Sequence, residues 1–317
     1  MQLGEIYQLA INEGIAADYR GEKGIKEMLA RQEKKYRDLK EEDKAAFDQE
    51  NLSNPFNDTR ILYGDSGRKV NTILAGIDIE AAEVLMADRL REKGTPIDLI
   101  MAHHPEGKAL AALHEVMHLQ EDILHILGVP INVAEGILSR RIGEVKRGLM
   151  PVNHNRTVDA AKIFDIPLMC VHTPADNLVS KFLDDLFNDK KPETVGDVVT
   201  GLKGVPEYQK AMEINAGPTI ILGSSDRRAG KIFVDMTGGT GGSEDAYEKL
   251  AQAGVGTIVG MHMGEKHRKE AEKNHLNVVI AGHIASDSLG MNLFLDSLAA
   301  KGIEIITCSG LTRVTRG

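Results

Sequence analysis

Short apolar runs of strand type recur along this sequence, and helical patterns separate most of them. The runs lie at residues 71–77, 97–102, 166–171, 219–222, 231–236, 255–259, 278–282 and 303–308. Strands that alternate with helices of ten or more residues form mainly parallel or mixed sheets that helices cover on both faces. The sequence therefore predicts an α/β fold.

Polar breaks divide this alternation into two halves. A segment with proline at residues 188–193 is followed by further helix and strand breakers at 201–206. We expect a first α/β half at residues 61–190 and a similar second half at residues 205–317, packed as one unit. Residues 1–60 are predicted to form a polar helical N-terminal extension. Its thin apolar stripe indicates packing by one edge on the body, with an oligomer contact as the alternative. Residues 129–133 are predicted to be a short strand or an extended segment.

Composition argues against several classes of protein. Acidic residues outnumber basic ones by 47 to 38, giving a net charge of −9, which disfavours a nucleic-acid-binding surface. No apolar stretch approaches transmembrane length, and the first residues do not resemble a signal peptide, so we expect a soluble cytoplasmic protein without a membrane partner. The two cysteines, Cys170 and Cys308, are too few for a thiolate zinc site.

Three of the strand-type runs end in residues that commonly bind metals. Ligands of open α/β sheets gather outside the carboxyl ends of the strands, so side chains delivered there can converge. Taken singly, the two adjacent histidines fit a pair of surface residues in a loop, and each of the other two pairs fits a helix-start carboxylate beside a core histidine. Three such ends at equivalent places favour one common site, between the halves. The residues are His103 and His104, His172 with Asp176, and His283 with Asp287.

Imidazole and carboxylate donors without thiolate select zinc, iron, manganese, nickel or cobalt. Even three of these imidazoles with the two carboxylates are more than one tetrahedral ion needs, and such a set suits two divalent ions bridged by a carboxylate and a hydroxide. Because a bridging hydroxide is a nucleophile at neutral pH, we expect a metal-dependent hydrolase of a small, nucleotide-like substrate. The alternative is a non-catalytic protein for metal storage, delivery or regulation through a partner.

Two further segments are candidates for roles in catalysis or binding. The run at 255–259 leads into His262 and Glu265, and either side chain could carry the proton that hydrolysis needs. Glu265 is equally well explained as an acidic first-turn residue. Residues 237–243 read Thr-Gly-Gly-Thr-Gly-Gly-Ser, between a strand and a helix. A tight turn explains this loop slightly better than a phosphate-binding role, in which its backbone N–H groups would contact a phosphate-bearing substrate.

Together these motifs resemble the Nif-three-like family, also known as GTP cyclohydrolase I type 2-like or dinuclear metal-centre proteins. The resemblance spans residues 60–314 and is carried by residues 71–79, 98–105, 170–176, 263–265 and 281–287. It implies two similar α/β halves facing a two-metal site, within a homo-oligomer that is a toroidal hexamer. GTP cyclohydrolase activity follows from the resemblance alone.

The resemblance also implies a ligand set. Asp287 stands where the family typically has glutamate, which shortens the reach of this carboxylate by one methylene. His172 is implied to be a neighbour of the metals and not a ligand. The implied ligands are His103, His104, Asp176, His283 and Asp287.

Overall fold

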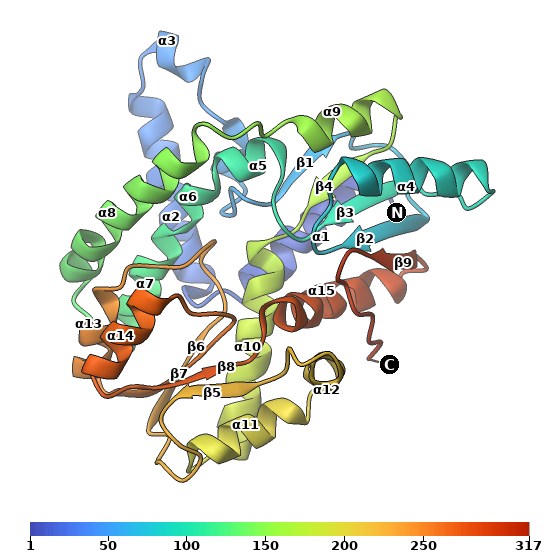
Figure 1. Ribbon diagram of the computed structural model, residues 1–317. Helices are drawn as coiled ribbons and strands as arrows, with labels where there is room; N and C mark the ends of the chain where they lie inside the picture. The colour runs from blue at the N-terminus through green and yellow to red at the C-terminus, as the bar shows by residue number, and fades with distance from the viewer. Residues whose placement is uncertain (317) are drawn as a thin grey trace.

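The computed structural model describes residues 1–316 and contains two mostly parallel sheets covered by helices (Figure 1). The first sheet has the order β1-β4-β3-β2-β9 and the second the order β5-β8-β7-β6. The predicted α/β class with two helix-covered sheets is confirmed. The strands are β1 (Arg60–Tyr63), β2 (Thr72–Gly76), β3 (Leu99–Ala102), β4 (Leu168–Cys170), β5 (Thr219–Leu222), β6 (Lys231–Asp235), β7 (Val255–Gly260), β8 (Asn277–Ile280) and β9 (Glu304–Cys308).

Apart from β9, the two sheets have the same arrangement. In each, an edge strand runs antiparallel to its neighbour, and that neighbour begins a run of three parallel strands. The edge strands β1 and β5 also share a break in register at the same place. This correspondence pairs β3 with β7 and β4 with β8. The carboxyl ends of β4 and β8 are therefore equivalent positions in the fold.

The helices α10 and α15, which follow β4 and β8, pack against each other where the two sheets meet (Figure 1). Within the described chain, no helix combines the length and apolar character needed to cross a membrane. The helices are α1 (Leu3–Ala16), α2 (Gly21–Asp38), α3 (Glu41–Lys44), η1 (Gln49–Leu52), α4 (Ala81–Glu92), α5 (Gly107–Ala111), α6 (Leu113–Val116), α7 (His118–Leu127), α8 (Ile131–Leu149), α9 (Arg156–Ile163), α10 (Thr173–Lys190), α11 (Val195–Lys203), α12 (Pro206–Glu213), α13 (Ala246–Gln252), α14 (Glu265–Lys273) and α15 (His283–Ala299).

Several segments differ from the sequence-based expectation. Helix α1, assigned to the polar extension, buries Leu3 and Ile6 in the core of the first sheet. Strand β9, assigned to the second half, pairs in parallel with β2 of the first sheet. The predicted strand at 129–133 was wrong, because helix α8 begins there directly after Pro130. Proline cannot donate a hydrogen bond to a strand ladder, but it is well tolerated at a helix start.

The two sheets are further joined by helices that follow one and cover the other. Helices α7 and α8 come after β3 of the first sheet, yet their apolar faces lie against the second sheet. Leu119, Ile123 and Leu138 share a core there with Phe233 and Ile258. The chain thus crosses between the two sheets more than once. The carboxyl ends of strands from both sheets lie around a common space.

Candidate metal centre

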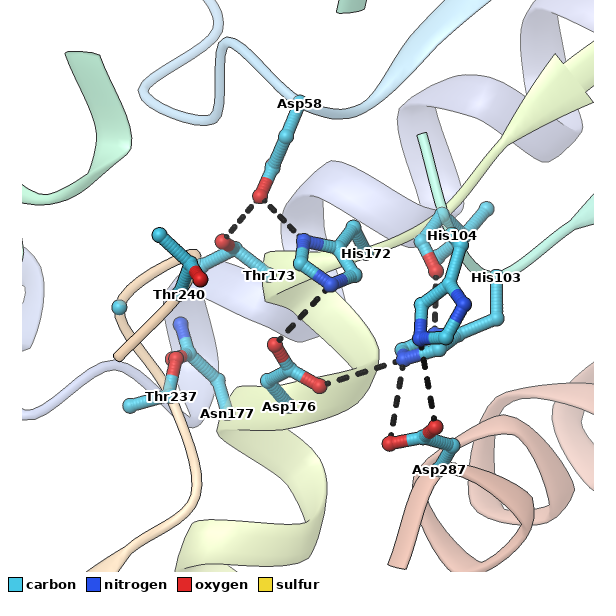
Figure 2. Close-up of polar contacts among 12 residues, drawn as sticks. Asp58, His103, His104, His172, Thr173, Asp176, Asn177, Thr237, Thr240 and Asp287 are labelled. Carbon is cyan, nitrogen blue, oxygen red and sulfur yellow. Dashed lines mark hydrogen bonds and ion pairs between the residues drawn. The ribbon is translucent and has the colours of Figure 1, made fainter. Parts of the chain in front are cut away.

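Four imidazoles and two carboxylates meet where the carboxyl ends of β3, β4 and β8 come together. Figure 2 shows three of these imidazoles, those of His103, His104 and His172, with the carboxylates of Asp176 and Asp287. The pair after β3 leaves the strand as the chain turns, and the other two pairs lie at the starts of α10 and α15. The structure thus brings the five predicted ligands and their neighbour His172 into one cluster. The cluster consists of His103, His104, His172, Asp176, His283 and Asp287.

Close packing of α10 on α15 sets the separation of the two carboxylates. A Cβ added to Gly290 of α15 would lie 2.3 Å from the carbonyl oxygen of Ala175 in α10, so the two backbones touch here. Ala175 directly precedes Asp176, and Gly290 lies within one turn of Asp287. On the other side of α10, Gly14 of α1 approaches Pro174 so closely that a Cβ would lie 2.7 Å from the Cβ of Pro174. Backbone contact between helices therefore positions both carboxylates.

Hydrogen bonds to Nδ1 orient the two histidines that follow β3. Nδ1 of His103 lies 3.0 Å from the carbonyl oxygen of Val171. Because a carbonyl only accepts, Nδ1 carries the proton and Nε2 of His103 keeps a free lone pair. Nδ1 of His104 lies 2.6 Å from Oδ1 of Asp78, which directs its Nε2 toward the carboxylates. Both rings are thus prepared to donate Nε2 to a cation.

A buried carboxylate performs the same task for His172. Asp58 is fully buried, and its Oδ2 lies 2.7 Å from Nδ1 of His172 and accepts a hydrogen bond of 2.6 Å from the Thr173 hydroxyl (Figure 2). Burial alone would raise the pKa of Asp58, but the contacts with His172 and Thr173 lower it below its usual range. Carboxylates commonly accept a hydrogen bond in this way from the histidines of metal sites, and this bond fixes the orientation of the ring that faces the ion.

All four Nε2 atoms face the carboxylates. For His103, His104 and His283 the gaps are 3.4–3.5 Å, which exceeds the usual length of a strong hydrogen bond. Two donors bound to one ion at about 2.1 Å each are roughly 3.0–3.5 Å apart, so these gaps fit ions between the side chains. The pairs are His103 with Asp176 and with Asp287 (both 3.5 Å), His104 with Asp287 (3.4 Å), His283 with Asp287 (3.5 Å) and, at the longer distance of 3.8 Å, His172 with Asp176.

Buried atoms without partners lie in the middle of the cluster. Among the described residues, Nε2 of His103, Oδ1 of Asp176 and both carboxylate oxygens of Asp287 are buried and have no hydrogen-bond partner. Native proteins rarely leave such atoms unsatisfied, because each costs free energy. Cations held between them would satisfy all four atoms. The donor set and its geometry therefore fit divalent metals.

The donors fall into overlapping groups of three. One group consists of His103, Asp176 and Asp287, and a second consists of His104, His283 and Asp287. Asp287 belongs to both groups, with Oδ1 facing His103 and Oδ2 facing His104 and His283. The third group joins His103 and His104 to His172, which the family resemblance had placed outside the ligand set.

The buried charges shift the pKa values of the cluster strongly. Burial raises the pKa of Asp176 to about 8, although His172 opposes this shift. The pKa of His172 is raised to about 9, because Asp176 and Asp58 outweigh the opposite effect of burial. Burial alone would raise the pKa of Asp287, but the surrounding imidazoles hold it well below its usual range. Asp287 is thus a carboxylate at neutral pH, whereas the coupled pair Asp176–His172 holds a proton at neutral pH in the metal-free protein.

These pKa values predict that metal affinity increases with pH up to about 8, the pKa of Asp176 in the metal-free protein. Metals bind the carboxylate form, so at lower pH each binding event must first release a proton. Titration against a competing chelator at several pH values measures this trend. Calorimetry in two buffers of different ionisation enthalpy measures the proton release. An affinity that does not change over this range would contradict the assignment of Asp176 as a ligand.

The structure also reveals Asp58 and Asp78 as supporting residues that sequence reasoning missed. Asp78 directly follows a predicted strand, like the ligands, so the strand-end pattern contained a usable signal for it. Asp58 lies in the segment assigned to the N-terminal extension, more than a hundred residues before His172. No spacing rule connects residues so far apart in sequence, and only the fold brings them into contact.

We expect Asp58→Asn to weaken metal binding by up to the roughly 10- to 100-fold cost of losing the outer partner of a ligating histidine, because His172 lies beside the ligands. The uncharged amide of the new asparagine no longer accepts hydrogen bonds from both His172 and Thr173 as the carboxylate of Asp58 does. The ring of His172 therefore loses its fixed orientation. Competition titration gives the affinity. Asp159→Asn, at an exposed position on α9, is the control and should bind metal like the unmodified protein. Equal affinity of both variants would exclude a supporting role for Asp58.

The cluster opens into a cavity of about 540 Å³. Side chains of the cluster, the glycine-rich loop 237–242 and the segment after β7 line this cavity together. The wall combines polar groups with apolar ones, including Leu110, Leu113, Met236 and Met261. The glycine-rich loop is anchored beside the cluster, because Thr237 donates a 2.7 Å hydrogen bond to Asn177, the residue after Asp176.

The two predicted proton carriers differ in their positions. His262 lines the cavity, and its ring centroid lies 4.9 Å from that of His283. Glu265 is exposed at the start of α14 and forms a two-point ion pair with Arg268. This contact and the nearby Lys269 lower the pKa of Glu265. Its geometry is that of a first-turn carboxylate, and it does not line the cavity.

Comparison with solved structures identifies the fold. The structure matches the crystal structure of a NIF3 superfamily protein from Sphaerobacter thermophilus with a TM-score of 0.70 and 25% sequence identity, covering 80% of this chain and 92% of that chain. It matches reduced HcgD from Methanocaldococcus jannaschii with a TM-score of 0.53 and 16% identity, covering 83% of this chain and 93% of that one. No protein-family model matches the sequence, and no curated protein matches it. The match to the NIF3 superfamily confirms the resemblance seen in the sequence motifs.

Proposed function

From the NIF3 superfamily fold and the donor cluster, we propose that this chain is a dinuclear metal protein that hydrolyses a small molecule in the cavity above the cluster. One observation supports this most: unsatisfied buried metal donors form the end of a cavity of about 540 Å³ with a partly apolar wall. Concave sites of this size and mixed polarity are typical of small-molecule sites in proteins.

The ligands in this proposal are His103, His104, Asp176, His283 and Asp287. His103 and Asp176 would hold one ion, and His104 and His283 would hold the other. Asp287 would be shared, because its two oxygens face the two groups. When bound, a pair of divalent ions activates water at neutral pH and polarises the bond to be broken. Asp58 and Asp78 keep the imidazoles in place.

His262 is the proposed proton carrier. Its ring lies beside the ligand His283 and lines the cavity, so it can reach a leaving group bound there. Proton transfer by a positioned imidazole commonly contributes about 10²–10⁴-fold to a rate. The exposed ion pair of Glu265 with Arg268 makes this glutamate the weaker candidate.

The glycine-rich loop is proposed to contact an anionic part of the substrate, such as a phosphate. Its carbonyl oxygens already have partners: Gln120 donates to those of Gly238 and Thr240, and Arg141 donates to that of Gly241. The loop is therefore rigid, and the guanidinium of Arg141 lies at the cavity wall. Rigid glycine-rich loops with a nearby cation are suited to binding anions.

The experiment is a hydrolysis screen with the metal-loaded protein. Phosphoester, amide and cyclic-amidine substrates are each tested with the protein loaded with zinc, iron, manganese, nickel or cobalt. Activity that requires metal and falls roughly 100-fold or more in His262→Ala at unchanged metal content would support the proposal. Metal binding with no turnover of any substrate class would instead favour metal storage or delivery.

A further inference from the structure

Asp235 is a carboxylate that belongs to none of the ligand groups of the proposed metal centre. It is the last residue of β6, and its side chain opens into the same cavity as the metal cluster. No described residue forms a hydrogen bond or ion pair with it. Its strand leads into Thr237, which is hydrogen-bonded to Asn177 beside the cluster. Asp235 is thus connected to the neighbour of Asp176 by two residues of backbone and one hydrogen bond.

The side chain of Asp235 is exposed to the cavity that it lines. The surrounding protein nevertheless raises its pKa to about 6, with His267 acting in the opposite sense. The phenol of Tyr247 is near enough for the charge of Asp235 to raise the pKa of that hydroxyl further. A carboxylate that lines a cavity, has no protein partner and has a perturbed pKa is a candidate for function.

A small apolar side pocket adjoins this carboxylate. The pocket has a volume of about 50 Å³, and Thr237 and Gly242 of the glycine-rich loop are among its lining residues. Asp235, Tyr247 and His267 line both the side pocket and the main cavity, so they form the passage between the two. Ile123, Leu138 and Phe233 are among the apolar residues that line the pocket. A small apolar group could enter it beside the carboxylate.

We infer that Asp235 is a recognition residue for the substrate, and that it accepts hydrogen bonds from an N–H donor such as an amidine or an amino-substituted ring nitrogen. A carboxylate has two acceptor oxygens, which match two N–H groups that lie side by side. A ligand held in this way has one edge on Asp235 and its body in the main cavity, toward the metal cluster. The apolar side pocket then selects a small substituent next to the donor nitrogen. This inference rests on the proposed function, because it describes the substrate of the same cavity.

The test measures binding of three small N–H donors: benzamidine, guanidine and 2-aminopyridine, with pyridine as the matched compound lacking the amino group. Isothermal titration calorimetry is carried out on the whole protein, as isolated and after treatment with a chelator. Asp235→Asn is the test variant, and Asp189→Asn, exposed near the end of α10, is the matched control. Loss of a charge-assisted contact should weaken at least one donor roughly 10- to 100-fold in Asp235→Asn only.

The outcomes separate this inference from the proposed function. Binding of all three donors that is equal in the unmodified protein and in Asp235→Asn overturns the inference, as does the absence of binding by any of the three. Pyridine should bind weakly and with no dependence on Asp235. His104→Ala should lose metal yet keep the Asp235-dependent binding, because the two groups are separate parts of the cavity wall. If the protein binds no metal but the binding of N–H donors still depends on Asp235, the hydrolase proposal is wrong and the inferred recognition site is supported.

Discussion

Asp287→Asn is expected to abolish binding of two metal ions. Asp287 is the donor shared by two ligand groups, and its oxygens face His103 on one side and His104 and His283 on the other. The asparagine amide has no charge and only one ligating oxygen, so one position loses its ligand from this residue and the other keeps only a neutral, weaker one. The loss of affinity should exceed the roughly 10- to 100-fold cost of removing an outer-shell partner. Elemental analysis of purified protein gives the metal content.

Two further variants make this result interpretable. His103→Ala and Asp176→Ala should each lose metal from the group that they share. Asp185→Asn, which alters an exposed ion pair with Lys181 on α10, should keep the full metal content. Circular dichroism of each metal-free variant establishes whether the fold is intact. Unchanged metal content in folded Asp287→Asn protein would mean that the cluster is not the metal site.

Gly290→Ala is expected to destabilise the protein by at least about 3 kcal/mol and to weaken metal binding as well. The added Cβ would lie 2.3 Å from the carbonyl oxygen of Ala175, and this backbone atom cannot move without shifting α10. Separation of α10 from α15 also separates Asp176 from Asp287. Chemical denaturation with and without metal measures the stability, and competition titration measures the affinity.

The control for this substitution is Gly136→Ala. Gly136 lies within α8, and a Cβ there meets no atom within 4 Å. Alanine lowers the conformational entropy of the unfolded chain, so this variant should be more stable by roughly 0.5–1 kcal/mol. If Gly290→Ala were as stable as Gly136→Ala, the close helix contact could not be what positions the carboxylates.

Local pattern was sufficient for much of the fold. Apolar runs such as 219–222 and 255–259 coincide with strands β5 and β7 almost residue for residue, because strand and helix periods are visible in any short window. The repeated His-x-x-x-Asp spacing after two runs indicated equivalent sites, and the structure places both at equivalent strand ends. Pattern failed at residues 129–133, where a short apolar run is ambiguous between strand and helix.

What the sequence determined by itself is the chemistry of the strand ends: which donors stand there and that they share one edge of an α/β fold. Tertiary structure decided which distant partners complete the site. Asp58 reaches His172, β9 joins the first sheet, and Gly290 meets Ala175 through contacts between segments far apart in the chain. Asp235 also acquires significance only from the cavity around it. Periodicity reports a residue's local conformation, whereas burial and pairing across the fold depend on packing of the whole chain, which no short window contains.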